Sequence, residues 1–321
     1  MIRVSAGTAA CFGLSNSRMD AYPTTAYLLS GNCCLMNCAF CPQGSGDGES
    51  FKKLGRITWP AYSWSAVEEV LPAAEQKGIK RICLQSVRHR EGIKPLLGLI
   101  GELKGLSALP LSLSAWISSE EEGRALFDAG VDRISISIDV VNEEAYRGIK
   151  GGSLQNRLNL LLRCAEKNPG RMSTHLICGL GESEHEMLAL IDKLLQAGIT
   201  VALFAFTPLK GTPMENQAPP EKTSYRRIQA GHYLLQENLS SFASFKFSDG
   251  RLVSFGDLDE ELTLLLGDGN AFRTSGCPGC NRPYYNERPG RTLYNYHRPL
   301  GEGEKEKALR DLRASLSLER I

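Results

Sequence analysis

Short β-branched runs alternate with longer amphipathic segments between residues 24 and 208 of this 321-residue chain. The predicted strands are residues 24–30, 80–86, 110–116, 133–139, 172–180 and 200–208. The predicted helices between them are residues 59–77, 92–104, 118–129, 154–167 and 183–197. Strands and helices in this rhythm are typical of parallel βαβ units. Because no Gly-x-Gly-x-x-Gly turn follows the first strand, the pattern favours an α/β fold with a partial barrel over a dinucleotide-binding sheet.

The pattern changes after residue 211. A helix is predicted over residues 222–238, and the hairpin-like run FKFSDGRLVSF follows it, with Asp249-Gly250 as a two-residue turn. A short helix (258–266), a segment rich in Gly, Pro and Arg, and a charged helix (302–318) complete the chain. The predicted organisation is therefore an N-terminal extension (1–20), a barrel core (21–215) and a C-terminal extension (216–321).

Charge and hydropathy narrow the classes of partner. The chain has 37 Lys and Arg against 36 Asp and Glu, for a net charge of +1. A nucleic-acid-binding enzyme usually carries a marked basic excess, so no nucleic-acid partner is predicted. No run approaches the ~20 apolar residues of a membrane span, and the N-terminus lacks the apolar core of a secretion signal. We expect a cytoplasmic protein with no membrane partner.

Six of the ten cysteines fall in two groups, at residues 33–41 and 277–280. Cysteines clustered in a cytosolic protein bind metal or do chemistry more often than they form disulfides. Cys34, Cys38 and Cys41 follow the first predicted strand in C-x3-C-x2-C spacing. This spacing lets three thiolates reach three corners of a cubane iron–sulfur cluster. A structural zinc loop would want a fourth ligand nearby, and none is present.

The segment GNCCLMNCAFCPQGSG carries the signature of the radical S-adenosylmethionine (SAM) superfamily, which the chain resembles over roughly residues 20–215. The resemblance implies a partial (βα)6 barrel of the TIM type, a [4Fe–4S] cluster and S-adenosylmethionine as cofactor. The cofactor chelates the open iron, and its reductive cleavage gives a 5′-deoxyadenosyl radical. Phe40 stands where the family places an aromatic residue against the adenine.

The run SIDVVNEEAYRGIKGGSLQNRLNLL resembles the fourth strand and following helix of the biotin synthase and lipoyl synthase branch. The resemblance gives Ser137 and Asp139 to the polar strand end, with Asp139 on the ribose hydroxyls. It gives Arg157 to the methionine carboxylate, a sound pairing of charges. Without the resemblance, Arg157 would be read as a solvated charge on a helix.

Two further strand ends resemble the same branch. HLICGLGES corresponds to a glycine-rich strand end, where Gly179 would let the backbone approach the adenine and Ile177 would pack on its ring. Glu182 is expected to cap the helix that follows. FTPLKGTPMEN corresponds to the sixth strand end, where the backbone at Phe206 would contact the adenine edge.

A second metal site is predicted from the remaining cysteines. Biotin synthase carries a second cluster on strand cysteines, but Cys83 is the one match in this sequence, so Cys83 is predicted to be a core residue. Cys277 and Cys280 form a C-x2-C pair, and with Cys11 they would hold an auxiliary [4Fe–4S] cluster. The alternative is a structural zinc clip that fixes the tail.

The tail CPGCNRPYYNERPG resembles one protein of the split, two-component lipoyl synthase. The resemblance implies sulfur insertion into an octanoyl chain on a lipoyl-carrier protein, with a companion radical SAM protein and a reducing electron donor. Arg282, Tyr284, Tyr285 and Arg288 would close over the substrate or tie the tail down. The competing functions are another radical SAM chemistry (biotin synthase-like, mutase or hydrogenase maturase) and a non-catalytic, metal-bearing scaffold. No catalytic residue is assigned.

Overall fold

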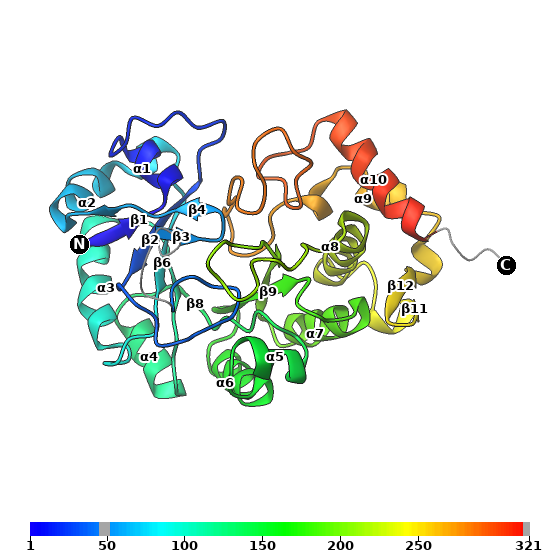
Figure 1. Cartoon of the computed structure of the whole chain (residues 1–321), viewed down its shortest axis with the longest axis horizontal. Helices are drawn as coiled ribbons and strands as arrows, with labels where there is room; N and C mark the ends of the chain where they lie inside the picture. Colours follow the sequence, from blue (N-terminus) through cyan, green and yellow to red (C-terminus); the bar gives the residue numbers. More distant parts are fainter. Residues whose placement is uncertain (45–51, 317–321) are drawn as a thin grey trace.

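The computed structural model describes residues 1–44 and 52–316, and its centre is an eight-stranded sheet in the order β10-β9-β8-β7-β6-β2-β1-β5 (Figure 1). Six of these strands are parallel and adjacent in chain order. They are β2 (Thr25–Ser30), β6 (Arg81–Ser86), β7 (Leu111–Ser114), β8 (Arg133–Ser135), β9 (Met172–Cys178) and β10 (Thr200–Ala205). Each lies within a predicted strand, so the predicted α/β fold with a parallel sheet is confirmed.

The first residues add to this sheet. Strand β1 (Ile2–Val4) pairs antiparallel with β2 and with β5 (Ala61–Tyr62), and α1 (Ala6–Phe12) follows it. A two-stranded ribbon of β3 (Lys53–Leu54) and β4 (Ile57–Thr58) lies beside the sheet. None of these elements was predicted, because each strand is too short to show a periodic pattern.

The helix predicted over residues 59–77 is shorter than expected. Ser63 caps α2 (Trp64–Val70) by accepting a hydrogen bond from the N–H of Ala66. The α-helix ends before Pro72, which has no N–H to donate, and two 3-10 turns (Leu71–Ala73 and Glu75–Lys77) follow.

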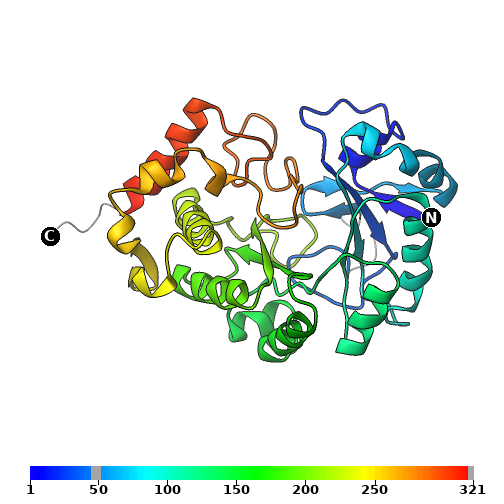
Figure 2. The same ribbon diagram turned by 180° about the vertical axis from the view of Figure 1, so that it is seen from behind.

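The other helices that cover the sheet agree with the prediction to within a few residues (Figure 2). They are α3 (Lys94–Leu106), α4 (Glu120–Asp128), α6 (Leu154–Lys167) and α7 (Glu184–Gln196). Ser183 and Glu186 form a capping box at the start of α7, which fixes where that helix begins. The additional helix α5 (Glu143–Ile149) is capped by Asn142.

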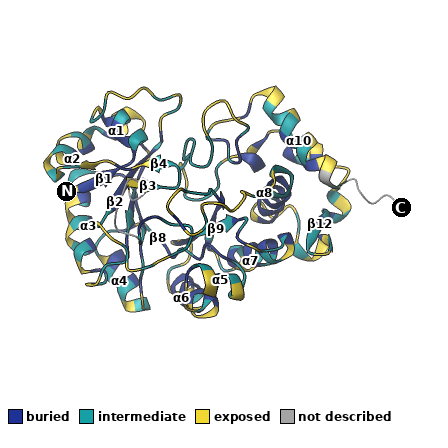
Figure 3. Ribbon diagram, viewed as in Figure 1, coloured by how far each residue is buried: buried dark blue, intermediate teal, exposed yellow. Residues whose placement is uncertain are grey.

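The C-terminal region packs on the same core as the sheet. Helix α8 (Lys222–Gln236) lies between α7 and α10 (Glu302–Leu316) and is largely buried (Figure 3). The hairpin of β11 (Lys246–Ser248) and β12 (Arg251–Ser254) turns at Asp249-Gly250, as predicted. Helix α9 (Leu262–Leu266) follows, with 3-10 turns at Phe242–Ser244, Gly256–Leu258 and Asn270–Phe272. The last two residues of the helix predicted to end at residue 318 lie outside the described residues.

Residues 274–287, which we call the tail loop, connect the two ends of the parallel sheet (orange in Figure 1). On one side, the hydroxyl of Ser275 accepts a hydrogen bond from the N–H of Leu203 in β10 (2.9 Å). On the other side, the Thr24 hydroxyl donates to the carbonyl of Gly279 (2.5 Å), and the Thr24 N–H donates to the side chain of Asn281 (2.9 Å). Because β10 and β2 are five strands apart, a loop that contacts both requires the sheet to curve around a central space.

The tail loop is also anchored near the carboxyl ends of the strands. The Asn286 amide donates to the carbonyl of Ala205 (2.6 Å) and to the hydroxyl of Thr207 (2.9 Å). The ring of Tyr285 meets Phe204 edge to face at 5.1 Å and lies over Gly55 in the turn between β3 and β4. The tail loop therefore forms one wall of the central space.

The Glu184–Arg227 pair joins α7, α8 and β12, and its loss is expected to destabilise the fold. Both side chains are buried, the contacts are bidentate (2.8 and 2.5 Å), and Glu184 also accepts the N–H of Leu252. Glu184→Leu leaves a buried guanidinium without its counter-charge, so we expect a loss of about 3–5 kcal/mol in the free energy of unfolding. Urea titration measures it, with Arg163→Gln, which removes an exposed ion pair, as the control that stays near wild type.

Gly55 is expected to hold the tail loop in place by lacking a side chain. A Cβ at this position would lie 2.7 Å from the Tyr285 ring, and the backbone φ of 59° already disfavours other residues. Gly55→Ala should displace the ring and raise deuterium uptake by amides of the tail loop. Gly78→Ala is the matched control, because its φ is 81° but nothing lies within 4 Å of its Cβ position. Equal uptake in both variants would contradict the role of this contact.

Candidate active site

One cavity of about 430 Å³ occupies the space that the parallel strands enclose. Every one of the six strands contributes a side chain to its wall, as do the cysteine loop and the tail loop. The strand residues include Tyr27, Cys83, Ser112, Ser135, His175 and Phe204. The volume lies in the range of small-molecule and cofactor sites.

Cys34, Cys38 and Cys41 all line this cavity, on the loop that leaves β2. The Sγ of Cys34 accepts the N–H of Met36 (3.4 Å) and the N–H of Arg88 (3.3 Å). The Cys41 N–H donates to the carbonyl of Cys38 (2.9 Å), which closes a tight turn between the two thiols. Backbone donors to sulfur stabilise a thiolate, so the loop suits a metal ligand better than a packing residue.

Burial raises the pKa of Cys38 to about 11 and that of Cys41 to about 12. These thiols therefore carry protons at neutral pH until a metal ion replaces them. In residues 1–44 and 52–316, no three Cys, His, Asp or Glu side chains are already gathered at ligating distances. The three thiols nevertheless share one short loop and one cavity, and that donor set fits an iron–sulfur cluster with one open iron.

Asp139 lies on the cavity wall in a left-handed conformation, with φ of 63°. Its carboxylate accepts a 2.5 Å hydrogen bond from the ammonium of Lys150, which also donates to the carbonyl of Ser137 (2.8 Å). Burial acts most strongly on Lys150 and lowers its pKa, but the charge and hydrogen bond of Asp139, together with nearby Cys38 and Tyr146, outweigh burial, and the pKa is raised. The role predicted for Asp139 on ribose hydroxyls stays a prediction. Lys150 was not identified in the sequence, because a single lysine before Gly-Gly shows no pattern.

Ser137, the other predicted strand-end residue, also lines the cavity. Its hydroxyl lies 3.1 Å from Nδ1 of His175, whose ring meets Phe204 edge to face at 5.2 Å. Burial lowers the pKa of His175 to about 4, so the imidazole is neutral at physiological pH. His175 was also missed, since an isolated histidine in an apolar strand resembles a core residue.

Arg157 is not on the cavity wall. Its guanidinium stacks on the ring of Trp116 at 3.8 Å, and Nη1 donates to the carbonyl of Ile117 (2.5 Å). Burial lowers its pKa to about 10, and its Nε is a buried donor without a hydrogen-bond partner. Arg157 is therefore buried, and it is not the solvent-exposed helix charge that would be expected without the family resemblance. An unpaired buried donor fits a carboxylate acceptor, so the predicted contact with the methionine carboxylate stays open.

Phe40, Ile177 and Phe206 line the cavity, but Gly179 does not. A Cβ on Gly179 would lie 2.9 Å from Cδ of Pro220, and φ is 97°, so the glycine is required by this protein contact. The Phe206 N–H is already bonded to the carbonyl of Cys178 (2.8 Å).

Glu182 does not cap the following helix, a role that Ser183 fills. Its carboxylate accepts the N–H groups of Gly179 (2.7 Å) and Leu180 (2.8 Å). The prediction that Glu182 caps the helix is therefore wrong, because its carboxylate instead accepts hydrogen bonds within the glycine turn before the helix.

Cys277 and Cys280 line the same cavity, and the structure groups them with Cys83 and not with Cys11. Cys11 lies on α1, outside the cavity wall, with its Sγ 3.6 Å from the carbonyl of Lys77. Cys83, predicted to be a core residue, faces the cavity from β6. Its burial and the nearby Cys277 and Cys280 raise its pKa.

The other tail residues were expected either to close over the substrate or to tie the tail down, and the structure separates them. Arg282 and Tyr285 line the cavity. Tyr284 instead packs against His297, with ring centroids 4.9 Å apart, and Arg288 is exposed. The arrangement thus brings two groups of thiols to one enclosed space.

Comparisons with known proteins agree with this geometry. The uncharacterized protein MJ0785 of Methanocaldococcus jannaschii is 29% identical over 193 residues, which cover 58% of this chain and 49% of that protein. A biotin synthase of Streptococcus agalactiae is 23% identical over 237 residues, covering 73% of this chain and 69% of the relative. Among solved structures, the [FeFe]-hydrogenase maturase HydG has a similar fold, with a TM-score of 0.54 at 14% identity.

The match to HydG covers 66% of this chain and 50% of that protein, so the chain spans about half the length of HydG, as it does of MJ0785. None of the described helices is both long enough and apolar enough to cross a membrane. The sequence model described as the radical SAM superfamily matches residues 28–194, which include the cysteine loop and five of the six parallel strands in full or in part. The chain belongs to the radical SAM superfamily.

Proposed function

We propose that this enzyme abstracts a hydrogen atom from an unactivated carbon and takes part in replacing that hydrogen with sulfur. The substrate we favour is an octanoyl chain on a lipoyl-carrier protein, with a companion radical SAM protein sharing the two insertions. The observation that carries the proposal is the second group of thiols, Cys83, Cys277 and Cys280, in the same cavity as the cysteine loop. We take the six parallel strands as the partial (βα)6 barrel of the superfamily.

The chemistry needs two metal groups and one enclosed space. A [4Fe–4S] cluster on Cys34, Cys38 and Cys41 with S-adenosylmethionine would supply a 5′-deoxyadenosyl radical, at the cost of one electron from an external reductant. That radical would take the hydrogen atom of the substrate C–H bond and leave a radical on the substrate carbon. A second iron–sulfur group held by Cys83, Cys277 and Cys280 would supply a sulfide to that carbon, and its iron would accept the one electron released when the C–S bond forms, so the exchange balances.

The chain's own residues would orient the cofactor and exclude water. Asp139 is held in place by Lys150 on the cavity wall, and Phe40 and Ile177 offer apolar faces beside it. The tail loop covers the side of the cavity between β10 and β2, where Tyr285 and Arg282 both contact Phe204. A radical in such a site is shielded from solvent, which favours reaction with the bound substrate.

A second cleft adjoins the cavity and supports a substrate borne on a carrier. It shares Arg56, Phe206, Thr207 and Asn286 with the cavity wall. Its lining includes five basic residues (Arg56, Lys222, Arg288, Arg291 and Lys307) against three acidic ones (Glu221, Glu287 and Asp311). This excess of positive charge suits an acidic partner surface with an acyl arm that reaches the cavity.

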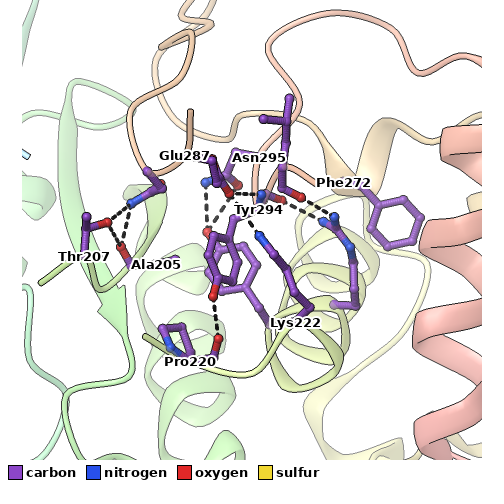
Figure 4. Close-up of polar contacts among 12 residues, drawn as sticks. Ala205, Thr207, Pro220, Lys222, Phe272, Glu287, Tyr294 and Asn295 are labelled. Carbon is purple, nitrogen blue, oxygen red and sulfur yellow. Dashed lines mark hydrogen bonds and ion pairs between the residues drawn. The ribbon is translucent and has the colours of Figure 1, made fainter. Parts of the chain in front are cut away.

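Not every cation of the cleft is available to a partner (Figure 4). Lys222 is 3.1 Å from a carboxylate oxygen of Glu287, and its ammonium lies over the ring of Tyr294. Burial lowers the pKa of Lys222 to about 8. Arg288 and Arg291 are exposed, so they are the residues we expect to meet a carrier.

A cytoplasmic location is part of the proposal, because all ten cysteines are free thiols and a reducing compartment preserves them. The likeness to biotin synthases supports sulfur chemistry in general. Biotin itself is disfavoured, since no cysteine of β7 or β9 lines the cavity, and Ser112 and Ser173 are among the residues that do.

Cleavage of S-adenosylmethionine and insertion of sulfur can be measured separately. Under anaerobic reducing conditions the reconstituted enzyme should convert S-adenosylmethionine to 5′-deoxyadenosine, and Cys38→Ala should abolish this. Cys33→Ala is the matched control, because Cys33 is exposed and absent from the cavity wall, and it should retain the activity. With octanoylated carrier protein and the companion protein, mass spectrometry should show added sulfur. Cleavage without sulfur would indicate another radical chemistry, and no cleavage would indicate a metal-bearing scaffold.

Docking of a carrier protein at the second cleft can be tested by reversing the charge of its exposed arginines. Arg288→Glu combined with Arg291→Glu should raise KM for an octanoylated carrier domain by on the order of tenfold, because it reverses the charge that steers the encounter. The kcat should stay near wild type, as should KM for a short octanoyl-lysine peptide that lacks the domain surface. An equal change for domain and peptide would contradict docking at this cleft.

A further inference from the structure

We infer that Cys83, Cys277 and Cys280 hold the second iron–sulfur cluster of this chain, inside the cavity, and that Cys11 takes no part. The inference deepens the proposed function by naming the ligands. The fate of the cluster's sulfide depends on the proposed function, but the existence of the cluster does not.

The tail loop brings two of the thiols together by local geometry. The Cys280 N–H donates to the carbonyl of Cys277 (3.0 Å), which closes the C-x2-C turn. Gly279 has φ of 78° and Gly276 has φ of 122°, and both values belong to a region that residues with side chains avoid. The backbone itself therefore closes the turn that carries both thiols.

The third thiol comes from the sheet. Cys83 of β6 is paired in register with Tyr27 of β2, and the Tyr27 hydroxyl lies 3.2 Å from the Sγ of Cys280. Cys83 and Cys280 pack on the same small cluster, which includes Tyr27 and Trp59. The Ser112 hydroxyl of the neighbouring strand β7 lies 3.6 Å from the Sγ of Cys277. The three thiols thus line the same part of the cavity, where β2, β6 and β7 face the tail loop, although within the described residues they are not already at ligating distances.

The charges around the thiols point to an anionic group. Arg81 donates to the Ser112 hydroxyl (2.8 Å) and to the carbonyl of Pro278 (3.3 Å), both beside the cysteines. Arg133 lies near Cys277, and Arg282 lines the cavity with Cys83. Within the described part of the chain, none of these three arginines forms a salt bridge with a carboxylate.

Three guanidinium groups without carboxylate partners beside a buried site are unfavourable unless negative charge is supplied. An iron–sulfur cluster held by three thiolates is anionic overall and would supply part of it. A neutral packing role for the cysteines would leave that positive charge uncompensated. With three protein ligands, one iron keeps an open position, and the remaining cavity lies beside it for a substrate.

The geometry also distinguishes Cys83 from Cys11 as the third ligand. Cys11 belongs to α1, and its thiol contacts the backbone carbonyl of Lys77, outside the cavity wall. Moving it to the tail loop would require α1 to leave the core to which Ala9 and Phe12 belong. Cys83 needs no such movement.

The test is iron and sulfide analysis of anaerobically reconstituted variants. Two cubanes correspond to about eight irons per chain, and one cubane to about four. We expect about eight in wild type and in Cys11→Ser, the matched control. We expect about four in Cys83→Ser, Cys277→Ser and Cys280→Ser.

A variant with Cys34, Cys38 and Cys41 all changed to Ala isolates the second site. It should retain about four irons with the Mössbauer spectrum of a cubane, and adding Cys83→Ser should remove them. If Cys83→Ser does not fold, as circular dichroism would show, Cys11→Ser in this background still separates the two ligand sets: it should retain about four irons, and their loss would make Cys11 the third ligand.

Loss of iron from Cys11→Ser with none from Cys83→Ser would overturn the inference, as would zinc in place of iron in the isolated site. A second cluster that is present but keeps its sulfide during turnover would refute the proposed sulfur insertion and leave the ligand assignment standing.

Discussion

The open side of the parallel sheet is the constraint on which the rest of this structure depends. Six parallel strands curve around a central space, but β10 and β2 do not pair with each other. The far side of β2 pairs with β1, whereas β10 ends the sheet, and an unpaired strand edge beside a reactive cavity would admit water and other chains. The tail loop meets this need with hydrogen bonds to Leu203 on one side and to Thr24 on the other. Because the same loop carries Cys277 and Cys280, the loop that closes the open side of the sheet also places two thiols in the cavity.

The buried ionisable side chains around the cavity differ in how their charge is compensated. The Asp139–Lys150 pair is self-compensating and can hold a polar strand end rigid in a low-dielectric site. His175 is kept neutral by burial, so it adds hydrogen-bonding capacity without charge. The arginines near the tail cysteines are different, because they form no salt bridge with a carboxylate of the described residues. The metal group proposed for those cysteines would supply negative charge there once the thiols lose their protons.

The elements and residues that the sequence predicted are those whose pattern is local. Apolar runs gave all six parallel strands, and the spacing of Cys34, Cys38 and Cys41 identified a loop that lines the cavity. The ligand roles of these cysteines, and the roles of Asp139 and Arg157, stay predictions. Strand β1 was missed because three residues show no period. Cys83 was taken as core although a signal was present: Arg81, Cys83 and Gln85 alternate toward the cavity, whereas Ile82 and Leu84 alternate toward the helices.

The two cysteine groups differ in how they depend on folding. The first is supplied by one short loop, so its ligands stay together even when distant parts of the chain move. The second joins a strand to a loop far along the sequence, so it can form only when the tail loop has docked across the sheet. In the proposed function, cofactor cleavage would therefore depend on a local motif, whereas the second site would depend on the docked tail loop. Because the two groups lie on separate segments, the tail loop could vary between proteins while the cysteine loop stays the same. This is consistent with one barrel fold hosting many reactions.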